Sequence, residues 1–262
     1  MKKLCFVITS VLMSSHALAE SNTYIRNGNI YSHQDQFFAG AGVATGSQFY
    51  KGQDHQTGAY LNGGYLNGGY HGEDFNADLS GINYRFLGTN DSAVNFSIFA
   101  VANPGFDADD ADILTGMKDR KFSGDLGLNA DIHLGNGTLS TKFQHDVTNI
   151  YDGFQADITY YHPINVGFGD LVPYAGVHYF SKDFANYYTG VTSSEATAQR
   201  PAYQADGTFA YKLGYALVIP VTKHLDITQA TGYSHIGANM ADSPLIDSNN
   251  QWVTTLGVNY SF

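Results

Sequence analysis

Residues 251–262 read Gln-Trp-Val-Thr-Thr-Leu-Gly-Val-Asn-Tyr-Ser-Phe, and this stretch decides the fold. Side chains alternate between the two faces of an extended strand. One face carries Trp252 and Tyr260 near its two ends, with Leu256 and Val258 between them. Aromatic rings at both interfaces and an apolar band between them are what a strand needs to cross a membrane. The length also fits, since a tilted spanning strand takes about 9–11 residues.

The chain ends on Phe262, two residues after Tyr260. A last strand with a terminal phenylalanine resembles the assembly signal of bacterial outer-membrane barrels, so we expect Tyr260 and Phe262 to be recognised by the barrel-assembly machinery. Taken alone, the same strand could be the edge of a soluble sandwich, and the rest of the chain must decide.

Residues 122–144 form the clearest hairpin in the sequence. Apolar and polar residues alternate over 122–134, Gly135-Asn136-Gly137 turns the chain, and the alternation resumes over 139–144. The first of these strands runs about thirteen residues, whereas ordinary strands have about five or six. This length favours a wall between lipid and a polar lumen over a sandwich.

The number of strands follows from eleven such runs and from the stretch before them. Single-chain bacterial barrels have an even number of strands and place both ends in the periplasm. Either residues 20–35 supply a twelfth strand or one run is not part of the wall. Residues 20–35 contain an Asn-Gly turn signal and could also form a small hairpin or a periplasmic lead-in. We predict an all-β, transmembrane, antiparallel up-and-down β-barrel of twelve strands, within a range of ten to twelve.

Two runs depart from simple alternation. Over residues 75–86 the apolar phase changes, which predicts one strand with a bulge at Ser80-Gly81. Residues 60–70 repeat a five-residue unit, and its odd period places Tyr65 on the opposite face from the tyrosines at either end. We expect a bulge or a lengthened loop there.

The links between strands fall into two groups. The short links at 135–137 and 220–224 are predicted to be periplasmic. The long ones at 103–119, 181–204 and 237–250 are predicted to be extracellular.

The N-terminus predicts export from the cytoplasm. Lys2-Lys3 precedes an apolar stretch over residues 4–12, and Ala17-Leu18-Ala19 is a small-x-small cleavage site. We expect residues 1–19 to be a secretory signal peptide and residues 20–262 to be the barrel domain. The chain has 1 cysteine, Cys5, which lies inside the predicted signal peptide, so the mature protein would have no disulfide.

Composition excludes two other classes of protein. A mean hydropathy of −0.21 is too polar for a helical membrane protein, whereas a barrel exposes only alternate residues to lipid. Without Lys2 and Lys3 the chain carries 11 basic against 24 acidic groups. Nucleic acid is therefore not an expected partner, because binding phosphates requires a basic surface.

The phases of the strands predict a set of lumen-facing polar side chains. These are Asp125, Asp131, His133, Lys142, Asp157 and Lys212. They could line a path for small solutes. Alternatively, they could pair among themselves inside a plugged barrel, since unpaired buried charges are costly. The sequence leaves both alternatives open.

An acidic loop raises the question of a metal. Asp107, Asp109, Asp110 and Asp112 could share a calcium ion, which takes 6–8 oxygen ligands. The spacing is not that of an EF-hand, and a solvated acidic loop explains it as well. We predict no metal site and no cofactor.

Two histidine clusters raise the question of catalysis. His145-Asp146, and His71 with Glu73 and Asp74, could serve a hydrolase. The sequence has no Gly-x-Ser-x-Gly nucleophile elbow. We predict no catalytic residues and expect a protein that is not an enzyme; an outer-membrane lipid-modifying enzyme is the less favoured alternative.

Several loop motifs resemble a known family. Tyr187-Tyr188-Thr189-Gly190-Val191, followed by Glu195-Ala196, is similar to a pattern of the MipA/OmpV outer-membrane proteins, also called the MltA-interacting protein family. Ser243-Pro244 and Gly40-Ala41-Gly42-Val43 also match it. The stretches 71–86 and 196–200 are most similar to the OmpV branch.

The resemblance implies an integral outer-membrane protein without catalytic residues. For the MipA branch it implies a scaffold between a murein hydrolase and a murein synthase, and for the OmpV branch a surface role that includes adhesion to a host-surface protein. The candidate interaction residues, in the loops at 181–204 and 237–250, are Tyr187, Tyr188, Gly190, Val191, Glu195, Ser243 and Pro244. Loop packing explains these residues as well as binding does. We therefore expect a scaffold or surface-interaction protein surrounded by outer-membrane lipid, with a narrow pore as the alternative.

Overall fold

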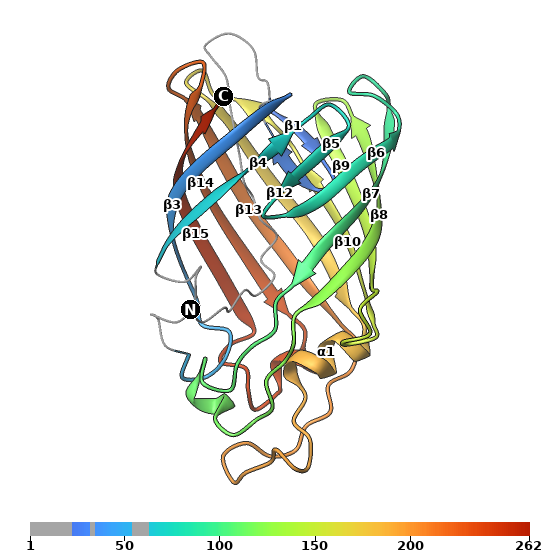
Figure 1. The fold of residues 1–262 in the computed structure, drawn as a ribbon, viewed down its shortest axis with the longest axis vertical. Helices are drawn as coiled ribbons and strands as arrows, with labels where there is room; N and C mark the ends of the chain where they lie inside the picture. Colours follow the sequence, from blue (N-terminus) through green and yellow to red (C-terminus); the bar gives the residue numbers. More distant parts are fainter. Residues whose placement is uncertain (1–22, 32–34, 54–62) are drawn as a thin grey trace.

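The wall of the molecule is a closed antiparallel β-barrel of twelve strands (Figure 1). The computed structural model describes residues 23–31, 35–53 and 63–262. Each wall strand pairs with its neighbours in sequence, and the first pairs with the last, which closes the ring. In chain order the strands are β3 (Gln36–Gly46), β4 (Gly63–His71), β5 (Phe75–Asp78), β6 (Gly81–Leu87), β7 (Val94–Asn103), β8 (Ser123–Leu134), β9 (Gly137–Asp146), β10 (Phe154–Tyr161), β12 (Asp170–Phe180), β13 (Thr208–Pro220), β14 (Leu225–Ile236) and β15 (Asn250–Ser261).

Smaller elements lie inside the barrel or at its ends. They are β1 (Tyr24–Arg26), β2 (Asn29–Tyr31), β11 (Ile164–Asn165), the 3₁₀ helix η1 (Asp112–Leu114), α1 (Lys182–Thr189) and α2 (Ala238–Ala241). In the part of the chain that the structure describes, no helix has the length and apolarity to cross a membrane.

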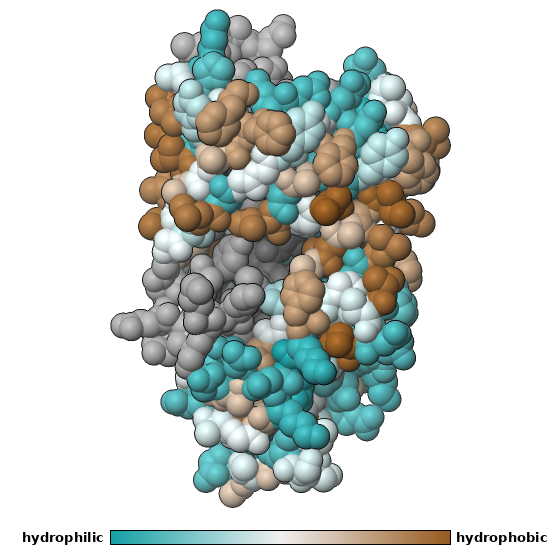
Figure 2. Space-filling view, viewed as in Figure 1, coloured by the Kyte–Doolittle hydropathy of each residue, from teal (hydrophilic) through white to brown (hydrophobic). Residues whose placement is uncertain are grey.

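The predicted alternation of side chains is present along the wall. In β8, Leu126 and Leu128 are 45 % and 57 % exposed on the outside. Asp125, the residue before Leu126, points inward and is only 1 % exposed. The same alternation runs along β15, where Trp252, Leu256, Val258 and Tyr260 point outward. Figure 2 shows apolar side chains gathered over the strands and hydrophilic ones at the two ends.

The twelfth wall strand comes from an unexpected place. The run at 75–86, predicted to be one strand with a bulge, is two strands, β5 and β6, which pair with each other. The Ser80 amide donates to Asp78 Oδ1 at 2.6 Å, and Gly81 has a φ of +122°. A side chain at Gly81 would begin 2.3 Å from the carbonyl oxygen of Ala100. The chain therefore reverses direction here, and the prediction of a bulge is wrong.

Residues 20–35 do not supply a wall strand. Within the described part of this stretch, β1 and β2 pair into a hairpin, with Asn27 and Gly28 at its turn (φ +47° and +58°). Two successive residues with positive φ make the tight turn that Asn-Gly favours. The predicted turn is present, but the prediction of a twelfth wall strand from this stretch is wrong.

This hairpin, here called the plug hairpin (residues 24–31), lies within the bore of the barrel (Figure 1). Ile25 and Ile30 are buried against a cluster of wall residues, Tyr161, Val172, Ala216, Val218 and Ala230. Its polar groups reach other strands: the Asn27 amide donates to Asp131 at 2.7 Å, and Arg26 donates to the carbonyl oxygen of Gly72 at 2.7 Å. Contacts in so many directions show that the hairpin spans the bore.

The repeated segment keeps a regular register where the structure describes it. Residues 63–71 form β4 and pair with β3 without a shift, so the expected bulge is not within this strand. Leu66 is 79 % exposed outside, and its neighbour Tyr65 lies on the other face, against Gly42 and Gly257. Residues 60–62 lie outside the described residues.

The two ends of the barrel differ as the lengths of the links predicted. The turns at 135–136 and 221–224, β3's first residue and the end of β15 lie at one end, and the long loops with α1 lie at the other (Figure 1). Because both chain termini of such a barrel face the periplasm, the long loops are predicted to be extracellular. Residues 1–22 lie outside the described residues, so the signal peptide stays a prediction.

If the outer face of the wall contacts lipid, a charged side chain there should destabilise the barrel more at the middle of the bilayer than near its surface. Replacing Leu128, in the middle of β8, with Arg should destabilise the folded barrel by about 2–4 kcal/mol. The matched change at Leu134, exposed on the same face near the periplasmic end, should cost only ~0–1 kcal/mol. Reversible denaturant unfolding in lipid vesicles measures both; equal costs would contradict a membrane-embedded wall.

Candidate functional site: the loop cap and the filled lumen

The extracellular loops share one apolar core. Buried residues from the loops after β3, β7, β9, β12 and β14 pack together, and we call this assembly the loop cap (residues 47–53, 104–122, 147–153, 181–207 and 237–249). Its core contains Phe49, Tyr50, Phe106, Ala111, Leu114, Met117, Tyr151, Phe184, Ala185, Tyr188, Val191, Ala205, Met240, Leu245 and Ile246. The short β5–β6 turn takes no part in the cap, because it lies deeper in the barrel, where Ser80 accepts from Asn29 of the plug hairpin at 3.2 Å.

The centre of the loop cap is α1, a helix inside the segment predicted to be a loop. Ser181 is its N-cap, and its hydroxyl accepts from the Phe184 amide at 3.4 Å. Phe184 and Tyr188 are four residues apart, so both rings lie on one face and contact each other at 4.6 Å. Gly190 ends the helix and its amide donates to the carbonyl oxygen of Asn186 at 2.8 Å.

The family-like tyrosines are structural parts of this cap. Tyr188 is 2 % exposed; its carbonyl oxygen accepts from the Tyr50 hydroxyl at 3.0 Å, and its own hydroxyl donates to the Pro104 carbonyl at 3.2 Å. Tyr187 is half-buried, and its hydroxyl accepts from the Lys121 amide at 2.6 Å. Val191 is buried and pairs with Tyr203.

Glu195 joins two loops through two arginines. Its carboxylate forms an ion pair with Arg120 at 3.1 Å, and its backbone carbonyl accepts from Arg200 Nη2 at 2.7 Å. Arg200 also donates to the carbonyl oxygens of Ile113 and Thr115. The segment 192–200 is thereby held against the β7–β8 loop.

The pKa of Glu195 reflects these bonds. Burial alone would raise it, but hydrogen bonds from Arg120, from Thr192 and from the Lys118 amide outweigh burial and lower the pKa from 4.5 to about 2. The carboxylate is therefore charged throughout the physiological range. Hydrogen bonds to the ionised form have this effect on an acid.

Ser243 and Pro244 occupy the loop before the last strand. The Ser243 hydroxyl donates to the carbonyl oxygen of Thr189 at 2.6 Å and is buried. Pro244 is half-exposed beside it. Five of the seven singled-out loop residues are thus buried and fix the shape of the loop cap, whereas Tyr187 and Pro244 reach its surface.

The exposed surface of the cap belongs to other residues. Thr192, Ser193, Ser194, Ala196, Thr197, Ala198 and Gln199 are all exposed on the segment that includes Glu195. This segment, here called the cap tip (residues 192–199), carries no charge apart from the buried Glu195. Sequence motifs pointed both to buried anchors such as Tyr188 and Glu195 and, through the stretch 196–200, to part of the tip itself.

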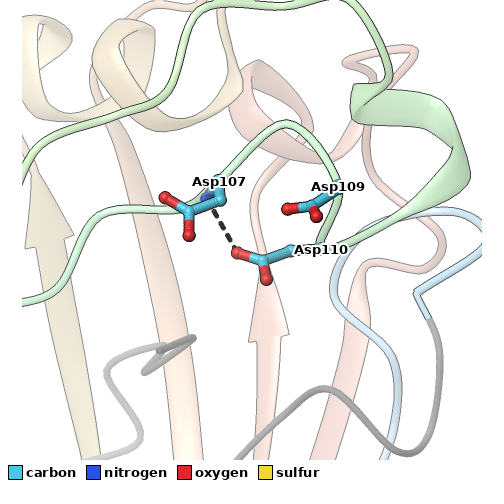
Figure 3. A group of neighbouring side chains, drawn as sticks. All are labelled: Asp107, Asp109 and Asp110. Atoms are coloured by element: carbon cyan, nitrogen blue, oxygen red, sulfur yellow. Dashed lines mark hydrogen bonds between the residues drawn. The ribbon is translucent and has the colours of Figure 1, made fainter. Parts of the chain in front are cut away.

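The acidic loop brings three of its four aspartates together. Ligand atoms of Asp107, Asp109 and Asp110 lie within 4.8 Å of one another, whereas Asp112 is not in the group (Figure 3). Asp107 and Asp109 are exposed, and the buried Asp110 accepts from the Asp107 amide at 2.8 Å. The carboxylate of Asp110 therefore shapes the turn of this loop.

The residues of the two histidine clusters make hydrogen bonds and ion pairs that hold neighbouring backbone and side chains in place. Asp146 accepts amide hydrogen bonds from Thr148, Ile150, Tyr151 and Asp152, and so organises the β9–β10 loop. The His145 ring contacts the backbone carbonyl of Asp146, not its carboxylate. His71 pairs with Asp78 at 2.9 Å, whereas Asp74 pairs with Arg85 at 2.7 Å.

The six lumen-predicted residues lie on inward positions of the wall, and most contact polar partners. Asp157 forms ion pairs with Lys212 at 2.6 Å and with His178 at 3.2 Å. Asp131 accepts from the plug hairpin, and Asp125 accepts from Gln144, Gln155 and Tyr151. The remaining two are His133 and Lys142. His133 Nδ1 lies 3.0 Å from the Thr138 hydroxyl, and Lys142 Nζ lies 5.5 Å from the centre of the Phe99 ring.

Tyr260 and Phe262 lie at the periplasmic end of the closing strand. Both are on the outside, and their rings meet edge to face at 5.2 Å. The Phe262 amide donates to the carbonyl oxygen of Phe37 at 2.9 Å, so the last residue is fixed to the first wall strand.

Comparison with known proteins gives the family. The model of MltA-interacting protein MipA matches residues 39–262. The chain belongs to the MipA family. It is 49 % identical to outer membrane protein OmpV of Vibrio cholerae and 46 % identical to outer membrane protein Omp26La of Vibrio anguillarum, each over the whole of both chains. The family resemblance seen in the sequence is confirmed, and this MipA-family chain is an outer-membrane protein.

More distant likenesses are weaker. The putative outer membrane protein YiaT of Escherichia coli is 28 % identical over 48 % of this chain and 52 % of its own length. Among solved structures, the outer membrane channel DcaP of Acinetobacter baumannii has a TM-score of 0.36 and 10 % identity, over 87 % of this chain and 96 % of that chain. A TM-score this low does not establish a shared topology.

The Glu195 contacts predict a pH dependence of the cap. Because its pKa is lowered on folding, Glu195 stabilises the cap fully above pH 4.5, and this stabilisation is lost as the pH falls towards 2. We expect hydrogen exchange at the amides of Lys118 and Thr192, corrected for intrinsic rates, to speed up over this interval.

Glu195→Gln should remove that pH dependence and speed up the same exchange at neutral pH. A charge-assisted hydrogen bond contributes about 1.5–3 kcal/mol, which corresponds to roughly a tenfold to hundredfold change. Asp183→Asn, at an exposed carboxylate of α1, is the matched control. It should change neither the pH dependence nor the rate of exchange at the Lys118 and Thr192 amides. A variant cap that exchanges like the wild type would show that Glu195 does not hold it.

Proposed function

We propose that this chain is a non-enzymatic outer-membrane barrel that presents its loop cap to a partner at the cell surface. The observation that supports this is the shared apolar core of the five loops, which fixes their relative positions before any partner binds. A pre-formed surface loses less conformational entropy on binding than separate loops do. The cap tip is the most exposed part of that surface and is our candidate contact.

A scaffold role in murein metabolism is the second candidate. The family's description names interaction with MltA, which supports a murein hydrolase as a partner. Murein lies in the periplasm, so such a partner would meet the opposite end of the barrel, at the exposed Asn136 and Lys223 turns. The two candidates therefore require opposite ends of the molecule.

Paired substitutions separate the two roles. Ala196→Arg with Ala198→Arg places two bulky charges on the cap tip, and Asn136→Arg with Lys223→Glu changes the periplasmic turns. We expect the first pair to reduce binding to host surfaces by at least about tenfold, as a disrupted hot spot does, and the second pair to leave it unchanged.

The same variants test the second candidate through capture of partners from solubilised envelopes. If only the periplasmic pair loses a captured murein enzyme while the tip pair binds like the wild type, the scaffold role replaces the surface role. Heat-modifiable migration in gels shows in every case that the barrel has folded.

We infer that the lumen does not conduct. The plug hairpin contacts wall strands on several sides, and the loop cap covers the other end. The charges of Asp157 and Lys212 are paired, and His178 contacts the same carboxylate, as in a filled interior. This supports the scaffold or surface role over a narrow pore.

Planar-bilayer recording tests this inference directly. The purified wild-type barrel should show no single-channel steps. A variant without both the plug hairpin (residues 24–31) and residues 184–199 of the loop cap should show them. If the wild type instead shows regular single-channel conductance steps, solute passage is the function.

A further inference from the structure

An apolar pocket opens on the outer face of the barrel at its periplasmic end. It has a volume of about 760 Å³ and lies where β3, β4 and β5 meet the end of β15. Its lining consists of Phe37, Phe38, Gly69, Tyr70, Phe75, Ala77 and Phe262, none of which carries a charged side chain. The volume falls within the range of about 300–1,000 Å³ that is usual for small-molecule sites.

The pocket exists because a small residue lies among large rings. Ala77 is the small residue on the outer face, where it pairs with Tyr70, which in turn pairs with Phe37. Around this small residue stand the rings of Phe37, Tyr70, Phe75 and Phe262, and those of Phe37 and Tyr70 are 4.9 Å apart. The sequence thus leaves a hollow in an otherwise continuous apolar surface.

The rings of the pocket point outward. Phe37, Phe75 and Phe262 are 65 %, 43 % and 69 % exposed, like other large apolar side chains on the outer face of the wall. The hydrogen bond from the Phe262 amide to Phe37 fixes one wall of the pocket to another. Apolar side chains gather on this face over β3, β4 and β5 (Figure 2).

We propose that this pocket binds one acyl chain of a phospholipid from the periplasmic leaflet of the outer membrane. The pocket is continuous with the lipid-facing band of the wall, so hydrocarbon is what it meets in the membrane. A flat wall contacts a lipid chain on one side only, whereas an open hollow flanked by four rings offers the chain more apolar surface. Burial of methylene groups is the favourable interaction.

The lining also determines what is recognised. Because no lining side chain carries a charge, we expect binding to depend on the hydrocarbon chain and not on the headgroup. A phosphatidylglycerol and a phosphatidylcholine with the same palmitoyl and oleoyl chains should therefore be retained equally. Retention of the anionic lipid alone would overturn the assignment of this pocket, because it would place the site near cationic groups instead.

Native mass spectrometry of the full chain tests the proposal. After delipidation and incubation with either synthetic lipid, the wild type should retain one lipid molecule. Ala77→Phe, which fills the pocket, should reduce that retention at least fivefold. Ala130→Phe, at an outward alanine of β8 away from the pocket, is the matched control and should retain lipid like the wild type.

A second variant protects the test against misfolding. If Ala77→Phe fails to show heat-modifiable migration, Phe75→Ala removes one wall of the pocket and should weaken retention as well. Wild-type protein that retains no lipid, or pocket variants that retain as much as Ala130→Phe, would overturn the proposal. These outcomes are independent of the partner-binding tests, which concern the two polar ends of the barrel.

Discussion

The need to pair every backbone amide and carbonyl inside lipid governs the rest of this structure. Hydrocarbon offers no hydrogen bonds, so a sheet that crosses a membrane must close on itself. Closure is completed where β15 pairs with β3, from Val253 opposite Gly46 to Ser261 opposite Phe38. Once the ring is closed, one face of every strand must be apolar, and the period of two along β8 and β15 follows from that requirement.

Closure creates a second requirement on the inside. A ring of twelve strands encloses a space too wide for its own short side chains to fill, and its inner face carries charges. The chain fills this space with the plug hairpin and pairs the charges locally, as between Asp157 and Lys212. At the extracellular end, apolar residues of five loops complete the closure. A lumen filled at one end and covered at the other suits a protein that acts through its surface.

The sequence predicts the parts of the fold that repeat and misses those that depend on distant contacts. The orientation of Leu126 and Leu128 follows from periodicity alone, because the membrane imposes it residue by residue. A change of phase at 75–86 is equally compatible with a bulge and with a turn, and only the contact of Gly81 with β7 decides for the turn. The plug hairpin has no periodic pattern, since its partners come from many strands.

The loop cap shows the same limit. Ser181 as an N-cap, with Phe184 and Tyr188 four residues apart, is a helix signal that sequence reasoning could have used. The bond between Arg120 and Glu195 spans 75 positions, and no local pattern announces it. Family motifs located Tyr188, Glu195 and the stretch 196–200, and the structure shows that Tyr188 and Glu195 are buried anchors whereas residues 192–194 and 196–199 around Glu195 are exposed.

The position of the plug hairpin in the chain has a consequence for how firmly it closes the bore. Only four residues separate Tyr31, its last residue, from Gln36, the first residue of the wall. A hairpin that left the lumen would remain tethered at the mouth, at an effective concentration of roughly millimolar or more. Its return is therefore intramolecular, so dilution of the protein does not weaken it, and a soluble copy of the same peptide would compete poorly for the same place.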